Sequence, residues 1–186
     1  INSSGLISIN LKDDDDIIFA GLIEDVSKEE ILIATCNGYS TRFLTDTIRP
    51  TGRSTQGVKA ITLREDDGVI SAMLIKNPDT DILTITENGY GKRTRLDEYP
   101  QYNRGGKGVI NMKTTEKTGK VVSVVEAAED EELMCITSNG VVIRTSMSEI
   151  SRIGRATQGV RIMKVGEDEK VAAITKIKKE EEFLED

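Results

Sequence analysis

Arginines recur at fixed spacing along this chain, and a regular array of cations is suited to bind a polyanion. Three of them, Arg53, Arg104 and Arg155, stand 51 residues apart in three Arg/Gly-rich loops, at residues 49–57, 100–108 and 152–159. The Gly, Ser and Thr neighbours in these loops let backbone N–H groups approach an anion as well. We therefore interpret the three arginines as phosphate-binding candidates. The alternative is that they are solvated loop residues that repeat with the fold.

Further cations surround these loops and are candidates for supporting roles. Arg42, Arg93 and Arg144 also lie 51 residues apart, on the segment that leads into each loop. For these three, structural pairing with nearby acidic residues is an equally good interpretation. Lys107, in the second loop, is a phosphate-binding candidate together with the three loop arginines, and the remaining supporting candidates are Arg49, Lys59, Lys92, Arg95, Arg152 and Arg161.

The residue types give little support for catalysis. The chain has no His, which removes the commonest general base and metal ligand. Cys36 and Cys135 are far apart and are expected to be reduced thiols rather than a disulfide or a zinc site. The phrase at residues 105–108, Gly-Gly-Lys-Gly, lacks the spacing and the Ser/Thr of an ATP-binding phosphate loop. We expect no catalytic residue, no metal and no cofactor in this chain.

The net charge of −7 is unusual for a protein that binds a polyanion, but its distribution matters more. Residues 180–186 hold five acids and no base, so the rest of the chain has a net charge of −2. Residues 49–59 and 152–164 contain bases and no acid. Such local runs can bind an anion because charges interact within a Debye length of about 8 Å.

The elements that position these cations follow the same period. Asn-Gly pairs at 37–38, 88–89 and 139–140 each follow an apolar run. Asn-Gly between β-forming residues is a strong hairpin signal, because a type I′ turn needs positive φ at both central residues. Each period therefore predicts a β-hairpin with a type I′ turn.

Two further strands are predicted in each period. One set follows the loops, at residues 5–11, 57–63, 108–112 and 159–163, and another lies near 17–23, 69–75, 121–125 and 171–177. Four short strands per unit indicate an all-β, propeller-like array, because one unit cannot bury its apolar face alone. We predict one domain over residues 1–186, divided into repeats 1–56, 57–107 and 108–158 and a half repeat with an acidic tail, 159–186.

Several phrases resemble the C-terminal domain of the DNA gyrase A subunit. They are Gly57-Val-Lys-Ala-Ile, Thr86-Glu-Asn-Gly-Tyr-Gly-Lys-Arg-Thr94, Asn103-Arg-Gly-Gly-Lys-Gly-Val109, Ile150-Ser-Arg-Ile-Gly-Arg-Ala-Thr-Gln-Gly159 and the acidic tail. The resemblance covers nearly the whole chain. It departs from the family at residues 101–108, Gln-Tyr-Asn-Arg-Gly-Gly-Lys-Gly, which has one residue more than the family's Gln-Arg-Arg-Gly-Gly-Lys-Gly box. We interpret this phrase as a relative of the box and expect the blade with the box to lie upstream.

The resemblance implies a β-pinwheel, in which neighbouring blades exchange strands and duplex DNA bends around a basic perimeter. It implies a cytoplasmic, ATP-dependent holoenzyme of two A and two B subunits, whose ATP, magnesium and cleavage sites lie in other parts. The partners would be duplex DNA, the N-terminal domain of the gyrase A protein and the gyrase B protein, with no membrane. We expect the isolated chain to be a monomer. Two alternatives are the equivalent domain of topoisomerase IV and a protein-interaction module without a nucleic-acid role.

The acidic tail generates the first prediction. Seven residues with five acids at the end of the chain would compete with DNA for the basic loops. Deleting residues 180–186 should tighten binding to linear duplex at low salt, measured by gel shift. An unchanged affinity would contradict this competition.

Overall fold

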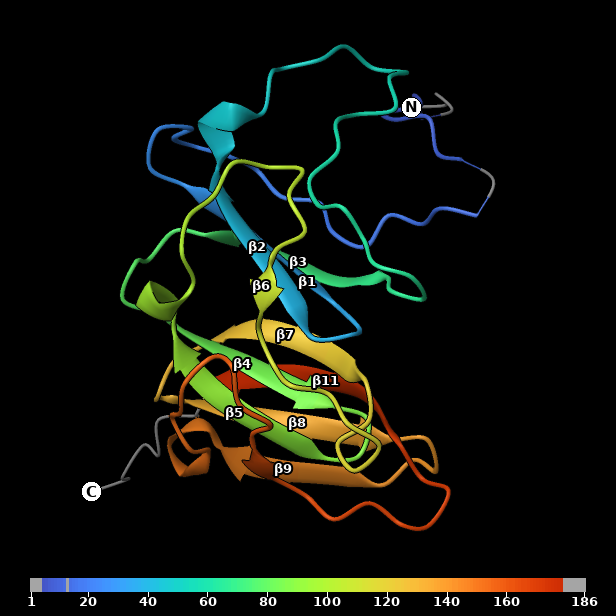
Figure 1. Ribbon diagram of the computed structural model, residues 1–186, viewed down its shortest axis with the longest axis vertical. Helices are drawn as coiled ribbons and strands as arrows, with labels where there is room; N and C mark the ends of the chain where they lie inside the picture. The colour runs from blue at the N-terminus through green and yellow to red at the C-terminus, as the bar shows by residue number, and fades with distance from the viewer. Residues whose placement is uncertain (1–4, 13, 179–186) are drawn as a thin grey trace, which may run out of the picture.

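The computed structural model describes residues 5–12 and 14–178, and its regular structure is β-sheet with three short 3-10 turns (Figure 1). The acidic tail lies outside the described residues. The strands are β1 (Glu30–Thr35), β2 (Tyr39–Leu44), β3 (Val69–Ile75), β4 (Asp81–Thr86), β5 (Tyr90–Arg95), β6 (Val109–Ile110), β7 (Val121–Ala127), β8 (Glu131–Thr137), β9 (Val142–Ser146), β10 (Val160–Arg161) and β11 (Val171–Lys178). The 3-10 turns are η1 (Thr45–Thr47), η2 (Leu96–Glu98) and η3 (Met147–Glu149).

Three antiparallel hairpins form the centre of the sheets, as the sequence predicted, but their turn type differs from the prediction. The hairpins are β1–β2, β4–β5 and β8–β9. In the first turn only Gly38 has positive φ, and its N–H donates to Thr35 O at 3.0 Å. Gly89 and Gly140 repeat this arrangement. A three-residue loop with a single left-handed Gly is a type I turn with a bulge, so the predicted type I′ turn was wrong.

The first two sheets each combine strands from three different repeats. The strand order is β3-β1-β2-β6 in the first sheet, β10-β5-β4-β7 in the second and β11-β8-β9 in the third. Ile110 pairs with Tyr39, and Arg161 pairs with Tyr90, so the outer strand comes from 71 residues later in both cases. This exchange confirms the pinwheel arrangement that the resemblance implied. The repeat boundaries describe the period of the sequence, whereas the sheets cross them.

The predicted strands at 5–11, 17–23 and 57–63 were wrong, because none of these segments forms a strand in the structure. The periodic exchange gives the physical reason. In the first two sheets the outer strand pairs with a hairpin strand that lies 71 residues earlier. For residues 57–63, a position 71 residues earlier falls before residue 1 of the sequence. These segments have strand-like sequences without a hairpin to pair with. Several of their apolar side chains are consequently exposed, among them Leu6, Ile17, Leu22 and Leu63.

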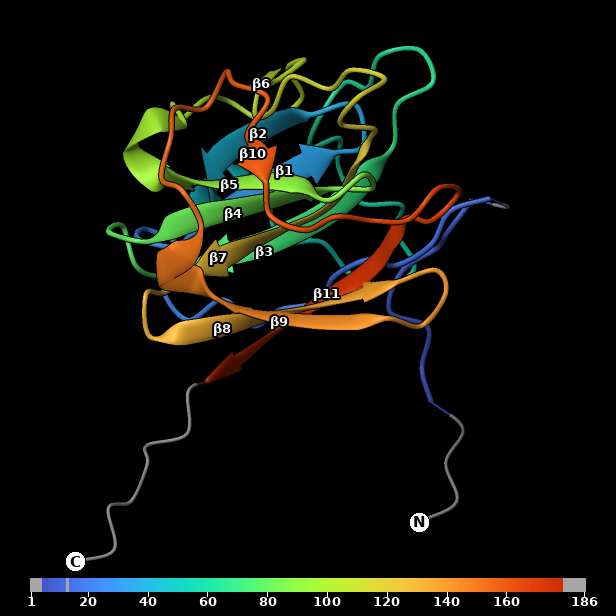
Figure 2. The same ribbon diagram turned by 90° about the horizontal axis from the view of Figure 1, so that it is seen from below.

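Apolar side chains fill the space between successive sheets. Leu32 and Met73 of the first sheet pack with Ile82 and Val124 of the second. A second cluster joins the second sheet to the third through Leu83, Ala127, Leu133, Cys135 and Met147. The strands β3, β7 and β11 lie next to one another in the interior, while β6 and β10 form outer edges (Figure 2). The loops that carry the repeated arginines therefore lie at the perimeter.

The two cysteines are free thiols, as predicted. Cys135 is buried on β8, and its burial raises the pKa of the thiol to about 12. Within the described residues no helix is long and apolar enough to span a membrane.

The hairpin turns provide a matched pair of substitutions. Gly89 and Gly140 have φ of 76° and 80°, so alanine at either position costs about 1 kcal/mol of backbone strain. A Cβ at Gly89 would also meet Met163 O at 2.5 Å, whereas at Gly140 no described atom lies within 4 Å. We expect Gly89→Ala to lower the free energy of unfolding by about 2–4 kcal/mol and Gly140→Ala by about 1 kcal/mol. Urea unfolding measures both, and equal losses would contradict the packing role of the second turn.

Candidate nucleic-acid interface

The strand arginines each form an ion pair with an acid of the neighbouring strand, which favours the structural interpretation of these residues. Arg42 forms an ion pair with Glu30 on the neighbouring strand and donates to Leu96 O and Tyr99 O at 2.9 and 3.0 Å. These two carbonyls belong to the η2 turn and its end, in the next repeat. Arg42 therefore ties its hairpin to the loop that follows the next hairpin.

Arg93 repeats this arrangement one period later. Its guanidinium lies 3.3 Å from Asp81 and donates to Ile150 O at 2.9 Å. Arg93 is 5% exposed, so it does not reach a duplex in this conformation. Arg144 pairs with Glu132 in the same way on its hairpin but is exposed. The same cross-strand ion pair thus recurs in all three hairpins. In each, an acid near the start of the first strand pairs with the arginine twelve residues later.

Lys92 is the most deeply buried of the candidate cations, with an exposure of 0%. Its ammonium donates to Gly154 O at 2.8 Å and to Arg155 O, and both carbonyls belong to an Arg/Gly-rich loop. Burial lowers the pKa of Lys92 to about 7, and repulsion from Arg155 adds to the effect while Glu98 opposes it. The prediction that Lys92 contacts DNA directly is not supported by this burial. Its position fixes the loop instead.

Two of the three loop arginines form the same pair of contacts. Arg104 donates from Nε to Thr47 O at 3.1 Å and from its terminal nitrogen to Lys59 O at 3.3 Å. Arg155 donates to Glu98 O at 3.0 Å and to Ile110 O, which are the positions 51 residues later. Both side chains are half-buried, and each has further N–H groups beyond these two bonds. The cation at this position therefore has a structural use that the sequence interpretation did not anticipate.

The other candidates divide into paired and unpaired cations. Arg95 pairs with Asp97 at 2.8 Å, and Arg152 pairs with Asp81 at 2.8 Å and Glu129 at 3.1 Å. Among the described residues, six exposed cations in or directly after the three Arg/Gly-rich loops have neither an ion pair nor a side-chain hydrogen bond: Arg49, Arg53, Lys59, Lys107, Lys113 and Lys164. Lys12, Lys117 and Lys178 are also exposed and have no such contact with a described residue, so unpaired cations are concentrated at the loops but not confined to them. The arginines of the hairpin strands are thus neutralised, and these cations of the outer edge are free.

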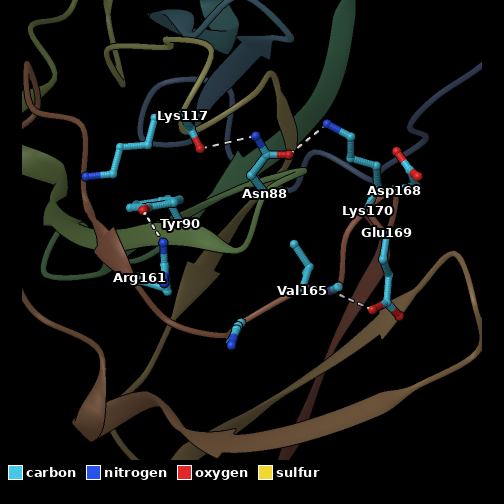
Figure 3. Close-up of a pocket in the computed structure, with 10 residues that line it drawn as sticks. Asn88, Tyr90, Lys117, Arg161, Val165, Asp168, Glu169 and Lys170 are labelled. Carbon is cyan, nitrogen blue, oxygen red and sulfur yellow. Dashed lines mark hydrogen bonds between the residues drawn. The ribbon is translucent and has the colours of Figure 1, made fainter.

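A polar hollow beside β10 extends this edge (Figure 3). Tyr90 lies between Lys117 and Arg161, whose charged groups are 5.5 and 5.4 Å from its ring centroid. Arg161 also donates to the Tyr90 hydroxyl at 2.9 Å. Lys164 and Lys170 line the same hollow, and Lys170 donates to Asn88 Oδ1 at 2.7 Å. An anion at its mouth would meet several cations, although Asp168 and Glu169 also line it.

Three further lysines lie at the outer edge or in the hollow beside it, although the sequence analysis did not single them out. Lys113 lies at the edge, and Lys117 and Lys170 line the hollow. Lys113 could have been found, since it lies one period before Lys164 in an acid-free run. Lys117 and Lys170 stand beside acidic residues in the sequence, at Glu116 and Glu169. Their contribution depends on the fold, because strand exchange brings residues 117 and 170 to the same turn.

The sequence matches one family over nearly its whole length. The model of the DNA gyrase C-terminal domain, described as a beta-propeller, matches residues 2–24, 29–76, 80–126 and 131–178. The DNA gyrase A protein of Deinococcus deserti is 44% identical over 187 residues, which cover 98% of this chain and 23% of that protein. The corresponding Staphylococcus epidermidis protein is 43% identical, with 98% and 20% covered. The chain thus spans about a fifth of the length of these relatives.

Solved structures have the same architecture. A DNA gyrase A C-terminal domain superposes with a TM-score of 0.81 and 28% identity, covering 92% of this chain and 58% of that one. The C-terminal domain of a DNA topoisomerase IV gives a TM-score of 0.85 with 24% identity, covering 92% and 53%. The second likeness shows the fold alone. Both support the β-pinwheel that the strand exchange defines.

The burial of Lys92 predicts a pH dependence of stability. Its pKa is about 7 in the folded chain and near the ordinary 10.5 in the unfolded chain, so the unfolded state binds more protons between these values. Stability should therefore rise with pH across this window. Lys92→Met removes this contribution. Between pH 7 and pH 10, the free energy of unfolding should therefore rise by on the order of 3 kcal/mol more in the parent than in the variant. Urea unfolding of both proteins at pH 7 and pH 10 measures the difference, and parallel pH profiles would contradict it.

Proposed function

Because the chain belongs to the DNA gyrase C-terminal domain family, we propose that it binds duplex DNA through the phosphate backbone. The observation that carries the proposal is the division of the cations into two groups. Strand arginines are paired with acids, whereas several loop cations of the outer edge have no ion pair among the described residues. Free cations at the perimeter are available to neutralise phosphates and release counterions.

The spacing of the free cations supports a path along successive blades. Arg53, Lys107 and Lys164 lie in or directly after the three successive Arg/Gly-rich loops, and the second and third loops lead into the outer strands β6 and β10, which occupy equivalent edges of their sheets. A duplex that follows these edges would have to bend around the array, at an elastic cost of order 1–6 kcal/mol for 40–90°. We propose that the phosphate contacts from successive loops offset this cost. Sequence readout has no evident basis, since contacts of this kind go to the backbone.

In the complete protein we propose that this domain bends or wraps DNA for a gyrase holoenzyme that introduces negative supercoils with ATP. The partners would be the N-terminal part of the gyrase A protein and the gyrase B protein, in a cytoplasmic assembly. Catalysis, ATP and magnesium would belong to those other parts. The phrase at residues 101–108 lies in the second loop and provides Arg104 and Lys107 to the proposed DNA path.

Two other functions remain as outcomes of the test. A topoisomerase IV domain would share the fold and bind DNA, but the curated relatives at 42–44% identity are gyrase A proteins. A protein-interaction module would use the same cations to bind an acidic protein and would not shift duplex DNA. A gel shift with linear duplex at low salt separates this module from the DNA-binding domains.

The proposal predicts which cations set the salt dependence of DNA binding. Replacing Arg53, Lys107 and Lys164 with Gln removes one free cation from each of the three loop regions. The affinity should fall steeply at low salt, and the slope of log affinity against log salt should decrease by about 0.9 for each lost phosphate contact. These residues are a better choice than Arg104 and Arg155, whose structural hydrogen bonds would also be lost.

A matched control uses Lys28, Lys76 and Lys176, which pair with Asp25, Glu24 and Glu131 away from the loops. Their replacement with Gln changes the net charge equally. The control triple variant should keep the salt slope of the parent. If both triple variants lose affinity equally, net charge rather than the outer edge determines binding. A salt-insensitive affinity of the parent would contradict phosphate binding altogether.

A further inference from the structure

The hollow beside β10 differs from the rest of the outer edge because its cations converge on one enclosed space. Its volume of about 360 Å³ is that of a small-molecule site. Lys117 comes from the segment before β7, Arg161 from β10 and Lys164 from the residues that follow β10. None of the three forms an ion pair with a described residue. Separate parts of the chain thus bring unpaired positive charge to one cavity.

Tyr90 adds a buried hydroxyl to these cations. The residue is 7% exposed, and its hydroxyl accepts a hydrogen bond from Arg161 at 2.9 Å (Figure 3). No described residue accepts the proton of this hydroxyl, although a buried Tyr O–H usually finds an acceptor. The hydroxyl of Tyr99, in contrast, donates to Asn111 Oδ1 at 2.6 Å. An acceptor atom inside the hollow would satisfy the remaining Tyr90 donor.

The two acids of the hollow lie away from this ring. Figure 3 shows Asp168 and Glu169 beside Lys170, on the other side of the hollow from the aromatic ring. Glu169 accepts from Gly166 N at 2.8 Å, and Lys170 pairs with Glu87 at 3.2 Å. The unpaired positive charge is therefore concentrated near the ring, and the opposite end of the hollow is acidic.

The first sheet has the equivalent tyrosine without the hollow. Tyr39 stands where Tyr90 does, and Ile110 takes the place of Arg161 opposite it. Arg64 lies over the Tyr39 ring with its Cζ 3.4 Å from the centroid, and it donates to a backbone carbonyl at 2.6 Å. A guanidinium in contact with the ring thus fills this space in the first sheet. The open, cationic space belongs to the second sheet and does not follow from the repeat.

We propose that the hollow binds a phosphate monoester as its dianion, at the end formed by the Tyr90 ring. Arg161 and the Tyr90 hydroxyl would donate to the phosphate oxygens, which are strong acceptors of charge-assisted hydrogen bonds. Lys117 and Lys164 would supply further charge, and two negative charges match three unpaired cations better than one does.

The acidic end of the hollow limits what the ligand carries beyond its phosphate. Asp168 and Glu169 would repel a second phosphate, so the remainder of the ligand is expected to be uncharged. A DNA strand has a phosphate on every nucleotide and would bring a second one towards these acids. The hollow therefore suits an isolated phosphate group better than the backbone of a duplex. This site goes beyond the proposed DNA binding, and its test contains no DNA.

Two small ligands separate this site from a contact to the DNA backbone. Methyl phosphate is a dianion above its second pKa of about 6, whereas dimethyl phosphate is a monoanion with the linkage of a DNA strand. Titration of the ¹⁵N-labelled chain at neutral pH and constant ionic strength measures the binding of both through amide chemical shifts. Methyl phosphate should shift the amides of Lys117, Arg161 and Gly166 and saturate at millimolar concentration. Dimethyl phosphate should bind about tenfold more weakly, because it has half the charge.

Substitutions identify the donors. Arg161→Ile introduces the residue that the fold already contains at position 110, and it should weaken methyl phosphate binding by about tenfold or more. Tyr90→Phe keeps the ring and removes the hydroxyl, so the affinity should fall by about fivefold, the effect of one hydrogen bond. Lys76→Gln is the control, since Lys76 pairs with Glu24 away from the hollow, and it should bind as the parent does.

The amide spectra also show whether each variant is folded, so a loss of binding is not confused with a loss of structure. A parent that does not bind methyl phosphate would overturn the proposal, as would equal affinity for the two ligands. Unchanged affinity in a folded Arg161→Ile or Tyr90→Phe variant would do so as well, and so would an equal loss in Lys76→Gln. The gel shift with duplex DNA is a separate measurement, so a failure of DNA binding is distinguishable from a failure of this site.

Discussion

The structure depends on the fact that no repeat completes its own sheet. Each complete sheet takes its inner strand from the next repeat and its outer strand from the one after, as β3 and β6 do for the first hairpin. Backbone N–H and C=O groups of a strand need partners, so this exchange locks neighbouring repeats together. The same exchange determines which segments can be strands. Residues 57–63 have a strand-like sequence but no hairpin, and they form no strand.

The exchange also separates structural cations from available ones. Arg42 and Arg93 connect a hairpin to the turn of the following repeat, where their charge is neutralised by Glu30 and Asp81. Lys92 donates to the carbonyls of Gly154 and Arg155 and so holds that loop. These contacts fix the second and third loops against the preceding hairpins. Arg53, Lys107 and Lys164, which form no ion pair among the described residues, are then presented on the outside of the array.

An acidic protein can therefore carry a basic edge. The net charge is −7, yet the acids that face Arg42, Arg93 and Arg144 are consumed in cross-strand pairs within the sheets. Screening over about 8 Å limits the influence of the remaining acids on a phosphate at the perimeter. The arrangement of charge relative to the strands, rather than its sum, makes DNA binding physically reasonable for this family member.

The sequence by itself determined the period, the three hairpins and the all-β class, because each depends on local signals such as Asn37-Gly38 that recur at 51 residues. The turn type is local as well, although the Asn-Gly signal alone did not distinguish it, since Gly140 has the same bulged turn as Gly38 without any described atom within 4 Å of an added Cβ. Burial of Lys92 and Arg93, in contrast, depends on loops some 60 residues away. Only the tertiary structure decided which strands pair and which cations are free, because those outcomes depend on partners that adjacent residues cannot specify.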